Sequence, residues 1–194
     1  ASGFVGHELY NMCKVHPNIN LSALSANKSA GELVDNKELE QSLRYETIGS
    51  IDFENVDFIF NCLPNMQMHK LIHNLNKNIR IIDLSIDFRL DGKEEYRNWY
   101  NLEHKSFELN DNFQFGLTEF NRDSIKKSKH VANPGCYATS VLVPLIELVS
   151  KNAIEHDDII IDAKSGYSGA GKTKSKQELI KEVNENISTY GVGD

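Results

Sequence analysis

Short apolar segments rich in β-branched residues alternate along the chain with amphipathic segments, an order typical of a parallel sheet covered by helices. The segments 58–60 and 79–82 are continuously apolar enough to predict strands inside the sheet. The predicted strands are residues 19–26, 45–48, 57–63, 79–84, 129–132 and 158–162. The pattern therefore predicts an α/β fold built on a Rossmann-like parallel sheet.

Helical spacing of apolar positions fills the gaps between these strands. The predicted helices are residues 6–15, 36–43, 66–76, 121–127, 137–151 and 174–187. Residues 137–151 are apolar on nearly every side, which predicts a buried helix with a kink at Pro144. The pattern changes at Asn133-Pro134-Gly135, so we expect a dinucleotide-binding domain over residues 1–133 and the start of an α+β catalytic domain over residues 134–194.

Composition narrows the class of protein. The 194 residues are 40% hydrophobic and 25% charged, as in globular domains. A net charge of −7 argues against nucleic acid or a membrane surface as a partner, and no apolar run has the length of a membrane span. The three cysteines form no CxxC pair, which favours reduced thiols in the cytoplasm and predicts no metal site.

The first residues resemble part of a dinucleotide-binding loop. Gly3 and Gly6 open a helical pattern, and such glycines let the backbone approach a pyrophosphate at a helix N-terminus. The next predicted strand ends near Ser25 and Lys28 without an acidic residue, which favours the 2′-phosphate of NADP over the ribose of NAD. Two alternative interpretations remain. Gly3 and Gly6 could form an ordinary turn, and Lys28 could be a solvated loop cation without a ligand.

Cys136 belongs to a Pro-Gly turn that leads directly into the predicted helix 137–151. The unpaired amides and positive dipole of a helix N-terminus favour a thiolate and stabilise an oxyanion, so this cysteine is the candidate nucleophile. The alternative is a small buried residue, which is the interpretation given to Cys13 and Cys62.

Several polar residues follow predicted strands and are expected at the carboxyl edge of the sheet, where open α/β sheets bind ligands. Arg89, close to Asp87 in sequence, could bind a carboxylate or phosphate, or only tie a loop through an ion pair. Residues 63–65 end another strand at the same edge. His69 and His73 stand four positions apart on a predicted helix and are interpreted as surface residues.

Residues 166–173 match the phosphate loop G-x-x-x-x-G-K-[ST] between a predicted strand and a predicted helix. An ATP-binding P-loop protein needs further strands after this loop, including one that carries an aspartate for Mg²⁺. Only 21 residues follow Thr173. A nucleotidase is therefore kept only as an alternative.

Together these segments resemble the N-acetyl-γ-glutamyl-phosphate reductase family of the semialdehyde dehydrogenase superfamily. The resemblance rests on five stretches: residues 1–9, 83–90, 115–119, 132–139 and 164–172. It implies NADPH-dependent reduction of N-acetylglutamyl 5-phosphate to the 5-semialdehyde in arginine biosynthesis, through a thioester on Cys136. Another acyl-phosphate reductase, acting on aspartyl or aminoadipyl phosphate, and a non-catalytic nucleotide-binding module remain alternatives.

The resemblance also implies site residues. Those expected to bind the cofactor are Ser2, Gly3, Val5, Gly6, Ser25, Lys28, Leu63, Pro64, Ser168 and Gly169. Those expected to bind the substrate are Arg89, Asn133 and Ser165. The family sequence Leu-Pro-His-Gly reads Leu-Pro-Asn-Met at residues 63–66, which puts contacts of that loop in doubt.

The resemblance finally implies that the chain is a fragment. The family places its catalytic histidine directly after a Tyr-x-Val-Gly motif, which here is residues 190–193, and a first sheet strand before residue 1. We expect this fragment alone to be inactive, and the complete protein to be an oligomer of identical chains that acts on a small acyl phosphate.

Overall fold

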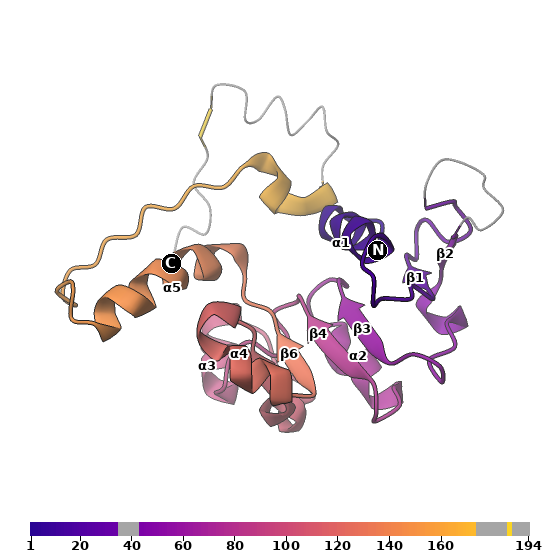
Figure 1. The fold of residues 1–194 in the computed structure, drawn as a ribbon, viewed down its shortest axis with the longest axis horizontal. Helices are drawn as coiled ribbons and strands as arrows, with labels where there is room; N and C mark the ends of the chain where they lie inside the picture. Colours follow the sequence, from indigo (N-terminus) through magenta and orange to yellow (C-terminus); the bar gives the residue numbers. More distant parts are fainter. Residues whose placement is uncertain (35–42, 174–185, 188–194) are drawn as a thin grey trace. The chain divides into compact units, whose positions relative to one another are not determined.

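The computed structural model describes residues 1–34, 43–173 and 186–187 (Figure 1). The chain divides into two compact units, one formed by Ala1–Gly49 with Asp162–Asp194 and the other by Ser50–Ile161. The domain boundary expected near residue 133 falls inside the second unit and stays a prediction.

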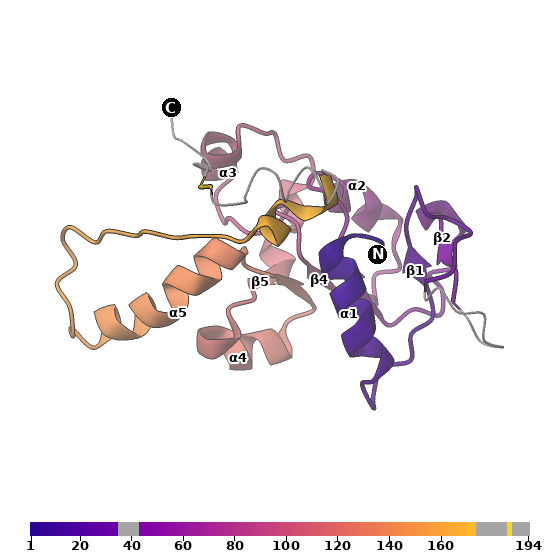
Figure 2. The same cartoon turned by 90° about the horizontal axis from the view of Figure 1, so that it is seen from above.

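The first unit joins a helix to a small parallel sheet. Helix α1 (Phe4–Lys14) starts close to the N-terminus, and strands β1 (Leu24–Ser25) and β2 (Tyr45–Glu46) pair in parallel (Figure 2). These strands are shorter than the predicted segments 19–26 and 45–48. The unit is held by a buried apolar cluster of Tyr10, Leu24, Ala26, Val34 and Tyr45. Most of the predicted helices 36–43 and 174–187 lies outside the described residues.

The second unit contains a four-stranded sheet in the order β3-β4-β6-β5, with every pair parallel. Its strands are β3 (Phe58–Asn61), β4 (Arg80–Asp83), β5 (Phe113–Phe115) and β6 (His130–Ala132). The predicted parallel α/β fold is confirmed. Segment 58–60 is not inside this sheet as expected, because β3 is its edge strand and Phe58 is 41% exposed.

Helices and 3₁₀ turns precede, connect and follow these strands. They are η1 (Ile48–Ser50), before the sheet, then α2 (Met68–Leu71), η2 (Ile72–Asn74), α3 (Lys93–Tyr100), η3 (Phe107–Asn112), α4 (Thr118–Lys127) and α5 (Cys136–Ser150). Helix α3 and strand β5 were not predicted. The signal for α3 was weak but present, because acidic residues occupy its first turn and Gly92 precedes it.

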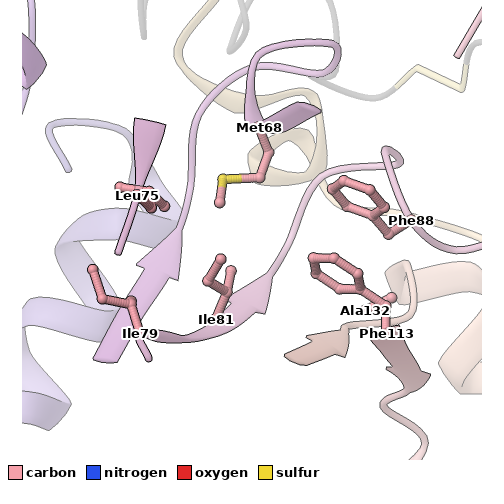
Figure 3. Close-up of a cluster of buried hydrophobic side chains, with 7 residues drawn as sticks. All are labelled: Met68, Leu75, Ile79, Ile81, Phe88, Phe113 and Ala132. Carbon is pink, nitrogen blue, oxygen red and sulfur yellow. The ribbon is translucent and has the colours of Figure 1, made fainter. Parts of the chain in front are cut away.

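The apolar core of the second unit lies between the sheet and the segments that follow β3 and β4 (Figure 3). The rings of Phe88 and Phe113 stack with their centroids 3.9 Å apart. Ile81 of β4 and Met68 of α2 are almost completely buried beside them. These contacts fix the segment after β4 against the sheet, which in turn places the residues around Arg89.

Two predictions were wrong in the described structure. Residues 158–162 form no strand, and Ile160 is 91% exposed, because no neighbouring strand pairs with them among the described residues. Helix α5 contains Pro144 as expected but has no buried residue, since the described part of the chain supplies no surface that covers it. Among the described residues, no helix is both long and apolar enough to cross a membrane.

Buried histidines make the second unit sensitive to acid. Burial, aided by the nearby charge of Lys129, lowers the pKa of His130 from 6.5 to about 4, and burial also lowers the pKa of His69 and His104. Below about pH 6.5 these histidines therefore bind protons in the unfolded chain but stay neutral in the folded chain. We expect the free energy of unfolding to fall between about pH 6.5 and 4, with His130 contributing about 3 kcal/mol.

Urea unfolding at a series of pH values measures this effect. His130→Leu removes the titrating ring, and the slope of stability against pH should become shallower by about 1.4 kcal/mol per pH unit. An unchanged slope in this variant would contradict the assignment of His130.

Candidate active site

Cys136 is the first residue of helix α5 and its side chain is exposed. Gly135 is the N-cap in an extended conformation, the cap makes no side-chain hydrogen bond, and the first turn carries no acidic residue. The helix dipole favours negative charge at this end of α5. Cys13 is buried, which raises the pKa of its thiol, so it is the less reactive group.

The turn that carries Cys136 is bound to the turn after β4. The guanidinium of Arg89 donates from Nε to the carbonyl of Asn133 at 2.8 Å and from Nη2 to the carbonyl of Leu84 at 2.7 Å. Asn133 directly follows β6 and Leu84 directly follows β4, and these strands are neighbours. The expected ion pair between Asp87 and Arg89 is not among the described contacts.

A buried polar group joins the ends of β3 and β4. The carboxylate of Asp83 accepts hydrogen bonds from Asn61 Nδ2 at 2.5 Å, from the Ser85 amide at 3.0 Å and from Ser85 Oγ at 2.8 Å. Burial raises the pKa of Asp83, and the hydrogen bonds oppose that shift. These bonds hold the two strand ends in register at the edge where ligands of such sheets bind.

The carboxylate of Asp87, in the segment after β4, binds backbone amides of the segment after β3. Its fully buried carboxylate accepts from the Met66 amide at 2.6 Å and from the His69 amide at 3.3 Å. Its carbonyl accepts from His104 Nε2 at 2.5 Å. The interpretation of His69 as a surface residue was wrong, since it is 1% exposed, whereas His73 is exposed as expected.

The loop over residues 63–66 carries Met66 where the family sequence has glycine. The structure shows how the backbone at Met66 is held. Met66 has a φ of 66°, a left-handed conformation that favours glycine. The Asp87 carboxylate and the hydroxyl of Tyr96, which donates to Met66 Sδ at 3.2 Å, hold it there. Asn65 Oδ1 accepts from the Ile86 amide at 3.3 Å, so the loop remains at the carboxyl edge.

The predicted dinucleotide loop lies in the first unit. A Cβ atom on Gly6 would meet the carbonyl oxygen of Ala1 at 2.6 Å, so only glycine fits, while a Cβ on Gly3 would meet nothing within 4 Å. Gly3 is the N-cap of α1, which has no acidic residue in its first turn. The backbone nitrogen of Ala1 lies at the carbonyl of Ser25 at the end of β1. This arrangement fits a phosphate-bearing cofactor.

The remaining predicted cofactor residues differ in exposure. Ser2 is partly buried, and Val5 and Lys28 are exposed. In the glycine-rich segment, Ser165 Oγ donates to the Gly166 carbonyl at 3.1 Å, and residues Tyr167–Thr173 form the 3₁₀ helix η4. The strand that a P-loop requires before it is absent from residues 158–162, which counts against an ATP site.

The structure therefore brings the predicted residues together in two groups. Arg89, Asn133 and Cys136 share the second unit with Leu63 and Pro64. The other candidates belong to the first unit: Ser2, Gly3, Val5, Gly6, Ser25, Lys28, Ser165, Ser168 and Gly169. Sequence reasoning did not assign roles to Asp83 or Tyr96. Among the described residues no group of His, Cys, Asp and Glu side chains could hold a metal ion.

Comparison with known proteins defines the class. Residues 1–128 match the family model described as "Semialdehyde dehydrogenase, NAD binding domain", and residues 136–194 match "Semialdehyde dehydrogenase, dimerisation domain". The chain belongs to the semialdehyde dehydrogenase family. The predicted nicotinamide dinucleotide domain is thereby confirmed.

Within this family the chain is similar along its whole length to N-acetyl-γ-glutamyl-phosphate reductases. It is 41% identical to a probable chloroplastic reductase of Arabidopsis thaliana over 99% of this chain and 49% of that protein. It is 36% identical to the reductase of Ehrlichia canis and 41% identical to that of Rhodospirillum rubrum, in each case over 100% of this chain and 57% of the relative. The chain thus spans about half the length of these relatives.

Solved structures agree on the fold. Aspartate semialdehyde dehydrogenase II from Vibrio cholerae superposes with a TM-score of 0.58 at 17% sequence identity, covering 89% of this chain and 46% of that protein. At this identity the likeness concerns the fold alone.

Proposed function

We propose that the protein containing this chain reduces N-acetyl-L-glutamyl 5-phosphate to the 5-semialdehyde with NADPH and releases phosphate. The observation that carries the proposal is the exposed thiol of Cys136 at the uncapped N-terminus of the 15-residue helix α5. Similarity to named reductases supports this choice of substrate and with it a role in arginine biosynthesis.

Cys136 acts as the nucleophile in this proposal. Its thiolate attacks the acyl carbon, an S–C bond forms, the C–O bond to phosphate breaks, and phosphate leaves. The positive end of the α5 dipole stabilises the oxyanion that develops on the carbonyl oxygen. The Arg89 guanidinium has N–H donors beyond those used for Leu84 and Asn133, and these are suited to the phosphate. Asn133 and Ser165 complete the proposed substrate contacts.

NADPH, when bound, would supply the hydride that reduces the thioester carbon. The S–C bond to Cys136 then breaks, which releases the aldehyde and returns the thiolate. The proposed holders of its pyrophosphate are Ser2, Gly3, Val5 and Gly6, because only glycine fits at Gly6 against the Ala1 backbone and the first turn of α1 carries no acidic residue. Ser25 and Lys28 are proposed to bind the 2′-phosphate. The loop residues Leu63 and Pro64, and Ser168 and Gly169, are proposed to line the rest of the cofactor.

Steady-state kinetics of the full-length protein tests the proposal. In the reverse direction, N-acetylglutamate 5-semialdehyde, phosphate and NADP should yield NADPH, with a kcat/KM at least 100-fold above that for aspartate semialdehyde. A preference for aspartate semialdehyde, or for the aminoadipate semialdehyde, would move the protein to another acyl-phosphate reductase. Binding of NADP without turnover of any semialdehyde would favour a non-catalytic module.

The choice of NADP is tested at Lys28, which is exposed after β1. Lys28→Glu should weaken NADPH binding by about tenfold to hundredfold, the range of a charge-assisted contact, and leave NADH binding nearly unchanged. Lys77→Glu is the control, because Lys77 is an exposed cation of the second unit at the amino end of β4, where none of the proposed cofactor residues lies. Titration by fluorescence measures both cofactors. Equal loss for NADH and NADPH would contradict a 2′-phosphate contact.

We further propose that the complete protein is an oligomer of identical chains in the cytoplasm. The match of residues 136–194 to a dimerisation domain supports the assembly, and three cysteines that form no disulfide suit a reducing compartment.

A further inference from the structure

The contacts of Arg89 are unusual for a residue whose task is to bind a substrate anion. Two of its three guanidinium nitrogens are committed to backbone carbonyls of its own chain, at Asn133 and Leu84. A planar fork with fixed donors can bind two separate carbonyl groups at once, which a lysine ammonium cannot reproduce with the same geometry. Arg89 therefore links the ends of two neighbouring strands.

The third nitrogen points to the same turn. A Cβ atom placed on Gly135 would lie 3.1 Å from Arg89 Nη1, closer than most Cβ contacts. Gly135 is the N-cap of α5, and its carbonyl accepts from both the amide and the hydroxyl of Thr139. The guanidinium thus occupies the space beside the residue that precedes Cys136.

We infer that Arg89 is a positioning residue for the nucleophile. By binding the turn over residues 133–135 to the end of β4, it fixes where α5 begins and hence where the Cys136 sulfur lies. A side chain at Gly135 would force the guanidinium to shift by a few tenths of an ångström. The inference rests on the proposed role of Cys136, and it adds to Arg89 a function other than substrate binding.

Alkylation of the full-length protein without substrate separates these roles. Iodoacetamide labelling of Cys136, followed by peptide mass spectrometry, should slow about fivefold in both Arg89→Ala and Arg89→Lys, because the thiolate loses its fixed place at the helix N-terminus. Arg89→Lys keeps the positive charge. If Arg89 acted on Cys136 only through its charge, this variant would therefore be labelled at the normal rate. Cys13 and Cys62 report general loosening, and their labelling should not rise.

A double-mutant cycle gives a second, independent measure. Gly135→Ala should lower kcat about tenfold in the normal background and change it little in Arg89→Ala, because the guanidinium it would displace is already gone. Binding of NADPH should stay unchanged in all three variants. Equal and additive losses would overturn the coupling.

The outcomes are separable from failure of the proposed reaction. If Arg89→Lys labels Cys136 at the normal rate and raises only the KM for the acyl phosphate, Arg89 is a substrate ligand alone and the inference is wrong. If no semialdehyde is turned over but labelling slows in both Arg89 variants, the positioning role stands and the proposed function fails. Faster labelling of Cys13 and Cys62 would instead assign Arg89 to stability.

Discussion

Cys136→Ser is expected to abolish turnover by the full-length protein, with kcat lowered by at least about 10⁴-fold. A serine hydroxyl at the start of α5 stays protonated at neutral pH, so the helix N-terminus has no anion to stabilise and the acyl phosphate is not attacked. The exposed position of residue 136 predicts that the fold tolerates the change. NADPH affinity should be nearly unchanged, since the proposed cofactor residues at the start of α1 are untouched.

Cys62→Ser is the matched control, because Cys62 is a half-buried thiol in the same unit, directly after β3. It should retain more than about a tenth of the normal kcat. Rapid-quench analysis should also detect a thioester on normal protein and none on the Cys136 variant. Substantial activity in Cys136→Ser would end the assignment of the nucleophile and favour the nucleotide-binding module.

Asp87→Ala is expected to lower the free energy of unfolding by about 3 kcal/mol. The substitution leaves the buried amides of Met66 and His69 without their acceptor, and the left-handed conformation of Met66 loses a bond that maintains it. Urea unfolding monitored by circular dichroism measures the loss.

Two further variants make this expectation specific. Asp87→Asn keeps one acceptor oxygen and should lose roughly half as much stability. Asp91→Ala removes an exposed carboxylate four residues further on, and surface changes of that kind stay within about 0.5 kcal/mol. Equal stability of the Asp87 and Asp91 alanine variants would show that the buried carboxylate does not hold the loop.

The predictions for Cys136 and Asp87 concern the same carboxyl edge of the four-stranded sheet. The carboxyl ends of β3, β4 and β6 carry, in turn, the loop of Met66, the segment of Asp87 and Arg89, and the turn of Cys136. Asp87 fixes the first to the second, and Arg89 fixes the second to the third. The site is thus a set of loops joined by side-chain hydrogen bonds to backbone groups.

Most of the framework could be predicted from the sequence. Alternation of apolar and amphipathic segments located α1, β3, β4 and β6, and the Pro-Gly turn correctly predicted a helix start next to Cys136, one residue from the observed start. Local signals suffice here, because helix caps and strand periodicity are properties of a few consecutive residues.

Elements whose stability depends on distant partners were not predicted or were predicted wrongly. The three residues of β5 form a strand only because β6 pairs with them, and the apolar run 158–162 forms none without a partner. The burial expected for α5 was likewise a statement about what covers the helix, which its own sequence does not contain. Tertiary context overrides intrinsic propensity in each case.

By itself the sequence determined the parallel α/β class and the position of Cys136 at the start of a helix. Only the tertiary structure decided that His69 is buried, that Asp87 bonds to the Met66 amide, and that Arg89 binds the turn before Cys136. The physical reason is that hydrogen bonds between side chains and remote backbone groups leave no periodic trace in the chain. They exist only once packing has brought the strand ends together.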